Sequence, residues 1–151
     1  MVFKSVEDFL NNIGQALGSS QWMEVDQQLI NQFADATHDH QWIHVDTERA
    51  KTDSPYQKTI AHGYLTLSLI PHFLNEIMEV ENIKQLVNYS VEKMVFRSAV
   101  PVNSKLRMKA SLKSAKGLGD ICKATIQCSF EVEGKVESVL EGTIVFLYYF
   151  G

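Results

Sequence analysis

One segment constrains the fold of this chain more than any other: the stretch from Gly63 to Val80, which reads GYLTLSLIPHFLNEIMEV. It is apolar almost all round as far as Leu74, and a helix of that kind is buried on most sides. We therefore predict a long buried helix that begins near His62. Pro71 lies inside it and lacks a backbone N–H, so we expect a kink or break close to this residue.

The chain after this helix has the pattern of β-strands. Runs of alternating apolar and polar residues occupy residues 87–96, 106–114, 121–133 and 136–150, with turn-like sequences between them. In the turn PVNS, Asn103 can take a left-handed backbone conformation. These runs predict an antiparallel sheet.

Helical spacing dominates the chain before the buried helix. Ser5 and Asp8 resemble a capping box, which predicts a helix from Val6 to Leu17 closed by Gly18. Three further elements are expected: an extended piece over residues 21–25, a helix from the N-cap Asp26 to Thr37, and a short helix over residues 47–51 after Asp46.

Helices followed by strands indicate an α+β domain. A length of 151 residues leaves room for one domain, so we expect residues 1–151 to form a single unit. A long central helix wrapped by an antiparallel β-sheet is, in outline, a hot-dog fold.

The composition excludes several classes of protein. With 45% hydrophobic and 21% charged residues, the chain is neither disordered nor collagen-like. Polar residues interrupt its longest apolar stretch, Tyr64–Leu74, so we expect no membrane span, and Glu7 and Asp8 argue against a signal peptide. Cys122 and Cys128 are expected on one face of a strand as reduced core residues, which favours a cytoplasmic protein.

Charge is unevenly distributed along the chain. Residues 1–90 carry a net charge of −7 and residues 91–151 a net charge of +3. Residues 93–123 hold eight basic residues and one acid, Asp120. Such a stretch indicates either an anionic ligand with a few phosphates or a solvated, lysine-rich strand edge. No nucleic-acid partner is expected, because no recognised binding motif accompanies the basic residues.

A cluster of imidazoles is the first candidate for chemistry. His38, His40 and His44 fall within seven residues, with Asp39 among them. Asp39 and His44 can converge on one water as an acid/base pair. The histidines could instead hold zinc together with Asp39 or Asp46, although their spacing matches no standard site, or they could bond to the backbone of a polar loop.

The second candidate is the junction Ala61-His62-Gly63, where a polar loop meets the buried helix. A helix N-terminus presents free N–H groups, and glycine lets a ligand carbonyl approach the backbone. Gly63 could equally serve tight helix–sheet packing. Together, the acid/base pair and the Gly63 amide suit the addition of water across a double bond conjugated to a carbonyl.

At these residues the chain resembles the MaoC-like, (R)-specific enoyl-CoA hydratase family, and especially its NodN-like branch. The segment FADATHDHQWIHVDTERA contains the Asp-x4-His motif of the family at Asp39 and His44. TIAHGYLTLSL is similar to the start of the family's central helix, and NYSVEKMVFRSAVPVNSKLR and EGTIVF are similar to its strands.

The resemblance implies a hot-dog fold, a homodimer, and reversible hydration of trans-2-enoyl-CoA to (R)-3-hydroxyacyl-CoA without metal or cofactor, CoA being part of the substrate. It implies that Asp39 activates water, that His44 orients it, and that the Gly63 amide binds the thioester oxygen. Gln41 and His62 are expected to help bind the substrate. The candidates for the CoA phosphates are Arg97, Lys93 and Lys105.

The chain departs from the family pattern at three positions. Gln41-Trp42 replaces an Asn-Pro pair, His38 replaces a small residue, and Pro71 replaces a serine of the central helix. Two alternatives therefore stay open: a hot-dog acyl-CoA thioesterase, and a non-catalytic module that binds acyl-CoA or an acyl carrier.

Overall fold

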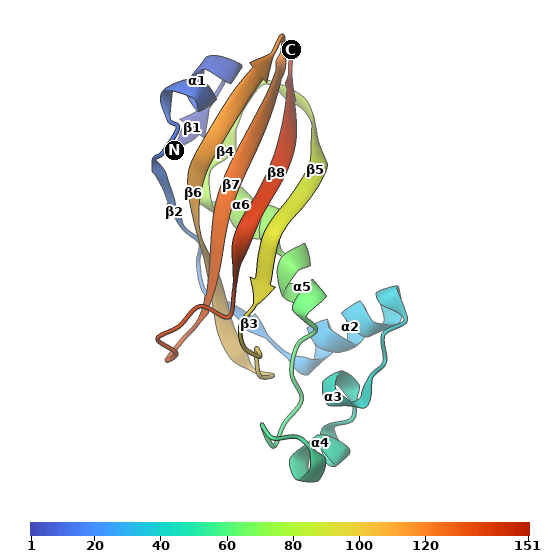
Figure 1. Cartoon of the computed structure of the whole chain (residues 1–151). Helices are drawn as coiled ribbons and strands as arrows, with labels where there is room; N and C mark the ends of the chain where they lie inside the picture. Colours follow the sequence, from blue (N-terminus) through green and yellow to red (C-terminus); the bar gives the residue numbers. More distant parts are fainter.

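A computed structural model describes all residues from 1 to 151. Its main feature is a twisted antiparallel sheet with a helix against one face (Figure 1). The order of strands is β2-β6-β7-β8-β5, and β3 also pairs with β6. The strands are β2 (Ala16–Ser19), β3 (Met23–Val25), β5 (Ile83–Phe96), β6 (Ser104–Leu118), β7 (Ile121–Val132) and β8 (Leu140–Phe150).

Local sequence explains the connections between the long strands. The four predicted strands are confirmed, although β5 begins four residues earlier and β8 begins four residues later than expected. Asn103 has φ 67° in the turn before β6, the left-handed conformation predicted for it. A small parallel pair, β1 (Val2–Phe3) with β4 (Glu79–Val80), lies outside the main sheet.

The predicted buried helix is present in two pieces, α5 (Gly63–Ser68) and α6 (Ile70–Ile77). Pro71 lies in the first turn of α6, where its missing N–H removes no helical hydrogen bond, so the break is at Leu69. The side chains of α6 that pack on the sheet recur at helical spacing: Ile70, Phe73, Leu74 and Ile77. The expectation of burial on most sides is wrong for α5, because Tyr64 is 68% exposed.

The N-terminal helix is shorter than predicted. The Asp8 N–H donates to Ser5 Oγ at 3.3 Å, as the capping box requires, but α1 spans only Val6–Asn11. The chain then turns at Gly14, whose φ is 87°, and continues as β2 against β6. Leu17 is therefore a buried strand residue. Pairing with β6 has overridden the helical spacing of this segment.

Three helices lie together beyond one end of the sheet, close to the start of α5 (Figure 1). They are α2 (Gln27–Thr37), α3 (Trp42–Val45) and α4 (Thr47–Asp53). Asp26 and Asp46 accept backbone N–H bonds at the first turns of α2 and α4, as predicted. The polar segment between α2 and α4 showed no period, so α3 was not expected.

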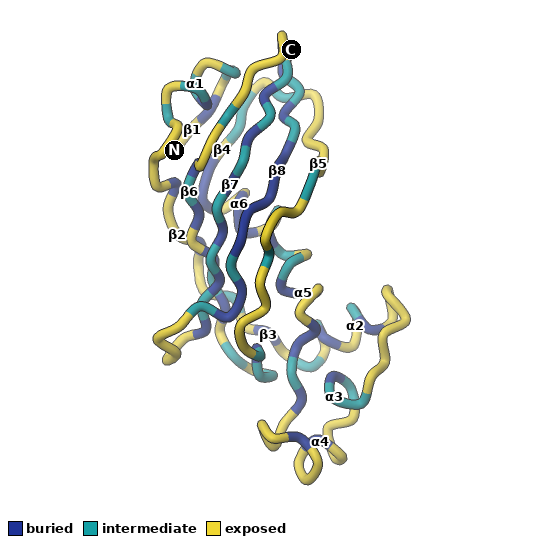
Figure 2. Tube along the Cα trace, viewed as in Figure 1, coloured by how far each residue is buried: buried dark blue, intermediate teal, exposed yellow.

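The core lies between α6 and the inner face of the sheet, where residues of β6 and β7 alternate between buried and more exposed (Figure 2). Cys122 and Cys128 are both buried and unbonded on one face of β7, as predicted. Burial raises the pKa of their thiols to about 11 and about 12. The α+β arrangement of a central helix against an antiparallel sheet is confirmed.

Part of the basic stretch lies at sheet edges: Lys93 is on β5, the last strand, and Lys113 and Lys116 lie beyond the residues of β6 that pair with β2 and β3. Most of it belongs to β6, which β2, β3 and β7 flank. Arg107 and Lys109 both pair with Glu131 of β7, and Lys123 lies over the ring of Tyr89. No helix of the chain has the length and apolar character that crossing a membrane requires.

Candidate active site

Three ionisable side chains meet where the α2–α4 region touches the start of α5. Asp39 follows α2, His44 belongs to α3, and His62 directly precedes α5. A carboxylate oxygen of Asp39 and one ring nitrogen of each histidine lie within 4.8 Å of one another. The structure therefore brings together Asp39 and His44, the predicted acid/base pair, and adds a second imidazole to them.

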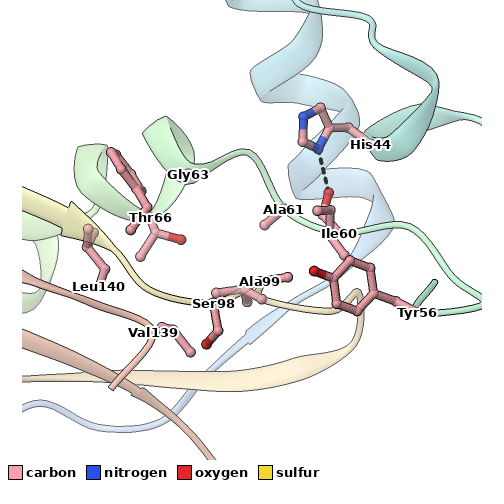
Figure 3. A pocket seen from close by; sticks show the side chains of 12 residues that line it. His44, Tyr56, Ile60, Ala61, Gly63, Thr66, Ser98, Ala99, Val139 and Leu140 are labelled. Carbon is pink, nitrogen blue, oxygen red and sulfur yellow. Dashed lines mark hydrogen bonds between the residues drawn. The ribbon is translucent and has the colours of Figure 1, made fainter. Parts of the chain in front are cut away.

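His44 is held in one orientation and one tautomer. Its side chain is buried, and its Nδ1 lies 2.7 Å from the backbone oxygen of Ile60 (Figure 3). Because a carbonyl oxygen only accepts, Nδ1 carries the proton and Nε2 keeps its lone pair. Burial lowers the pKa of His44 below its ordinary value of 6.5. His44 therefore offers an unprotonated Nε2 near neutral pH.

Asp39 lies in the turn that ends α2. His38 takes the left-handed conformation there, with φ 62°, and directs the chain back towards α3. The Asp39 carboxylate forms no ion pair, and its only hydrogen bond within the chain is a long one of 3.4 Å from the Gln41 N–H. Its backbone oxygen accepts a hydrogen bond of 2.9 Å from His62 Nε2. The carboxylate is thus available for chemistry while its main chain is held.

A cavity of about 310 Å³ begins at His44 and extends beneath α5 (Figure 3). Its walls are mostly apolar, and hydroxyl groups of Tyr56, Thr66 and Ser98 are its polar features. This combination suits an apolar chain that carries a polar head. The lining residues are His44, Tyr56, Ile60, Ala61, Gly63, Thr66, Phe96, Ser98, Ala99, Val100, Val139 and Leu140.

Gly63 lines this cavity as the first residue of α5. An N–H at that position has no acceptor in a preceding helical turn, so it is free for a ligand. A Cβ built on Gly63 would lie 2.6 Å from the Phe96 ring, closer than any real contact. Glycine therefore permits the close packing of Phe96 here, and a larger residue would require the partly exposed Phe96 ring to move.

The other predicted site residues lie outside the cavity wall. Gln41 is exposed at the start of α3, and its side chain forms no capping bond. Arg97 pairs with Glu141, and Lys105 lies 4.0 Å from Glu133. Among the three candidates for a phosphate, only Lys93 has no ion pair. It is exposed at an irregular point of β5 with φ 50°.

The metal set considered from sequence is not assembled. His40 pairs with Asp35 at 2.8 Å, and neither His38 nor His40 belongs to the cluster around His44. Asp39, His44 and His62 have suitable donor types, but the two imidazole planes are inclined by only 23° and stacked. A metal lies in the plane of each imidazole that binds it, so these rings would have to turn apart first. The arrangement fits acid/base chemistry better.

Several residues of the site were not predicted from sequence. The Ile60 carbonyl that orients His44 could not be predicted, because the position of a backbone group is not visible in the pattern of residue types. Tyr56 and Ser98 come from segments that meet only in the folded chain. Thr66 could have been found, since it lies one helical turn after Gly63 and so faces the same side.

Comparisons with known proteins identify the family of the chain. Residues 8–135 match the family described as MaoC like domain. The chain is 42% identical over 136 residues to 3-hydroxyacyl-thioester dehydratase Z of Mycobacterium tuberculosis, covering 89% of each chain. It is 36% identical over 148 residues to nodulation protein N of Rhizobium leguminosarum, covering 97% of this chain and 92% of the relative.

The fold is also that of a solved hydratase. The R-hydratase of Pseudomonas aeruginosa superposes with a TM-score of 0.73 at 17% identity, covering 92% of this chain and 83% of that one. The predicted hot-dog fold is confirmed by this likeness.

Proposed function

The chain belongs to the MaoC-like dehydratase family, and we propose that it catalyses the reversible (R)-specific hydration of trans-2-enoyl-CoA to (R)-3-hydroxyacyl-CoA. One observation carries the proposal. The Asp39 carboxylate lies within 4.8 Å of a ring nitrogen of His44, and His44 and Gly63 both line the apolar cavity. A hydration site needs these three groups: a base, an orienting acceptor and a donor to the carbonyl.

The proposed reaction follows from the roles that each group can take. A water between Asp39 and His44 gives a proton to the carboxylate while its oxygen bonds to C3 of the enoyl chain. The electrons of the C2=C3 bond move towards the thioester oxygen and form an enolate. The enolate then takes up a proton at C2. This proton is the one that Asp39 received from the water, delivered directly or through His44. Atoms and charge balance with water as the sole addition.

The Gly63 N–H supplies the third group. Negative charge develops on the thioester oxygen, and a fixed N–H directed at that oxygen stabilises the enolate more than the ground state. Gly63 lines the cavity, so we propose that the thioester oxygen reaches its amide from the cavity side, opposite the packing against Phe96. All proton transfers use the protein's own residues, and the proposal includes no metal or cofactor.

The phosphates of CoA are the proposed ligands of the basic residues near β5 and β6. Lys93 is free to bind one, whereas Arg97 and Lys105 would have to share or exchange their carboxylate partners. Gln41 is exposed beside Asp39 and is proposed to contact the substrate there. These assignments rest on the family resemblance and on charge.

A homodimer is proposed on the evidence of β5. It is the last strand of the sheet order, so one of its edges has no partner, and an unpaired edge invites pairing. Large apolar side chains on and beside it are exposed: Tyr64, Leu86, Val87, Tyr89, Val91, Val95 and Phe96. A second copy of the chain paired along β5 would cover them.

Product identification tests the function. Crotonyl-CoA incubated with the protein should gain one water and keep its thioester, giving 3-hydroxybutyryl-CoA of (R) configuration. Release of free CoA thiol instead would identify a thioesterase. Binding of crotonyl-CoA without any change in it would identify a binding module. Either of the last two results overturns the proposal.

A further inference from the structure

His62 is buried at the centre of the site, although it does not line the cavity. It is only 2% exposed, and its ring contacts Phe33 of α2 and His44 of α3, with centroid distances of 4.9 Å and 3.9 Å. Burial of a polar ring is costly unless its nitrogens are bonded. The contacts of these two nitrogens therefore show what the residue does.

One nitrogen is bonded and the other is not. Nε2 lies 2.9 Å from the backbone oxygen of Asp39 and must donate, because that oxygen can only accept. Nδ1 is then unprotonated, and it is the one buried side-chain polar atom of the chain without a partner. A proton on Nδ1 would likewise find no acceptor in the structure, so the neutral Nε2–H tautomer is the form that fits.

The bonded nitrogen links two parts of the proposed mechanism. His62 directly precedes Gly63, whose amide is proposed to bind the thioester oxygen. Its ring also donates a hydrogen bond to the backbone oxygen of Asp39, the proposed base. The distance between the base and the carbonyl donor therefore depends on this one hydrogen bond. The stacked contact fixes His44 against the same ring.

We propose that His62 is a positioning residue of the hydratase, which as its Nε2–H tautomer sets Asp39 and His44 relative to the Gly63 amide. This inference rests on the proposed function. An error of about 1 Å in the placement of reacting groups can reduce a rate about 100-fold. Loss of the hydrogen bond from His62 to the Asp39 backbone should therefore lower kcat.

The surroundings of His44 favour its unprotonated form. The titratable groups that face His44 are Asp39 from the turn after α2, His62, and Tyr56 from the loop after α4, while α2 contributes the apolar Phe33. Burial is the main cause of the lowered pKa of His44, and His62 and Phe33 are part of the packing around it.

Two substitutions separate the hydrogen bond from the packing. His62→Phe keeps a ring against His44 and removes the donor, whereas His62→Gln keeps an N–H near the position of Nε2. We expect kcat for crotonyl-CoA to fall about 10- to 100-fold in His62→Phe with little change in KM, and His62→Gln to recover much of it. His40→Gln, in the same loop and outside the cluster, is the matched control and should match wild type.

A spectroscopic measurement tests the same inference without turnover. Long-range ¹⁵N–¹H spectra of the histidine rings should show His62 as the Nε2–H tautomer and His44 as the Nδ1–H tautomer near pH 7.5. An Nδ1–H or cationic His62 contradicts the inference, as does wild-type kcat in a folded His62→Phe.

The outcomes also distinguish this inference from the function beneath it. Hydration by wild type that is unchanged in both His62 variants overturns the positioning role and leaves the hydratase intact. Absence of hydration in wild type overturns the hydratase and the positioning role together, whatever the tautomers.

Discussion

The imidazole rings of His44 and His62 are stacked, with centroids 3.9 Å apart and planes inclined by 23°. Each ring donates one N–H to a backbone oxygen, His44 to Ile60 and His62 to Asp39. Two neutral imidazoles with fixed tautomers therefore lie beside one carboxylate. Both ring N–H groups are used by backbone oxygens, so the second nitrogen of each ring and the carboxylate offer only lone pairs. This arrangement suits a general base and a hydrogen-bond acceptor that orients the water.

His44 should make the stability of the protein depend on pH. Its pKa in the folded state is lowered below 6.5, chiefly by burial, so the unfolded chain binds more protons once the pH falls to that range. The contribution of His44 is complete above about pH 7.5 and is lost as the pH falls through 6.5 towards the lowered pKa.

In His44→Gln, the decrease of Tm between about pH 7.5 and about pH 5.5 should be smaller than in wild type. Thermal unfolding followed by circular dichroism measures it. His40→Gln removes an exposed imidazole of the same loop and should change the slope less. An unchanged slope in His44→Gln would show that this histidine is not shifted on folding.

Gly63→Ala should impair both stability and activity. The added methyl group would meet the Phe96 ring at 2.6 Å, so the ring or α5 must move, and overpacking of this kind costs about 1–3 kcal/mol. The displaced amide would also hold the thioester less well. Chemical denaturation and kcat for crotonyl-CoA measure the two effects.

A second substitution separates these effects. Phe96→Ala removes the obstacle, so the double variant with Gly63→Ala should be more stable than the sum of the single changes predicts. Additive changes in the free energy of unfolding would show that the clash with Phe96 is not the cause.

A charge on the free edge of β5 should disrupt the proposed dimer. Val91 is 52% exposed there, and Val91→Lys places a charge where a second copy would pack. Light scattering after size exclusion should give a dimer mass for wild type and a monomer mass for the variant. Lys113→Glu, on β6 away from this edge, serves as the control. A monomeric wild type would contradict the proposed pairing.

Asn103 offers a test of local conformation far from any catalytic role. Its φ of 67° is tolerated by asparagine and free of strain in glycine, whereas a β-branched residue is disfavoured there. Asn103→Val should therefore lower the free energy of unfolding by about 1–2 kcal/mol, and Asn103→Gly should leave it nearly unchanged. Equal stability of the two variants would mean that the turn can adopt another conformation.

The fold was largely predictable because its strongest signals are local and agree with one another. Asp26, Asp46 and Ser5 cap helices as their residue types require, and the strands of the second half alternate as a half-buried sheet does. The prediction was wrong around Leu17, because the neighbouring Ala16 pairs with Ser111 of β6, 95 residues away in sequence, and this pairing outweighs the helical spacing. Pairing between strands far apart in the chain cannot be inferred from the residue pattern of one short segment.

The site was predictable only in part. Asp39 and His44 stand out because they lie in a histidine-rich polar segment without a structural period and match the Asp-x4-His motif of the family. The depth of His62, its bond to the Asp39 main chain and the Ile60 carbonyl arise from packing between segments. The basic residues show the opposite problem, since charge runs are visible in sequence but their partners, such as Glu131 and Glu141, are not.

The measurement that tests the central claim most directly is the loss of enoyl-thioester absorbance of crotonyl-CoA, with wild type beside Asp39→Asn. The amide keeps the shape of the carboxylate but cannot take a proton. Wild type should consume the substrate, and the variant should be slower by about 100-fold or more while it unfolds at a similar temperature. A folded Asp39→Asn that turns over like wild type would contradict the account.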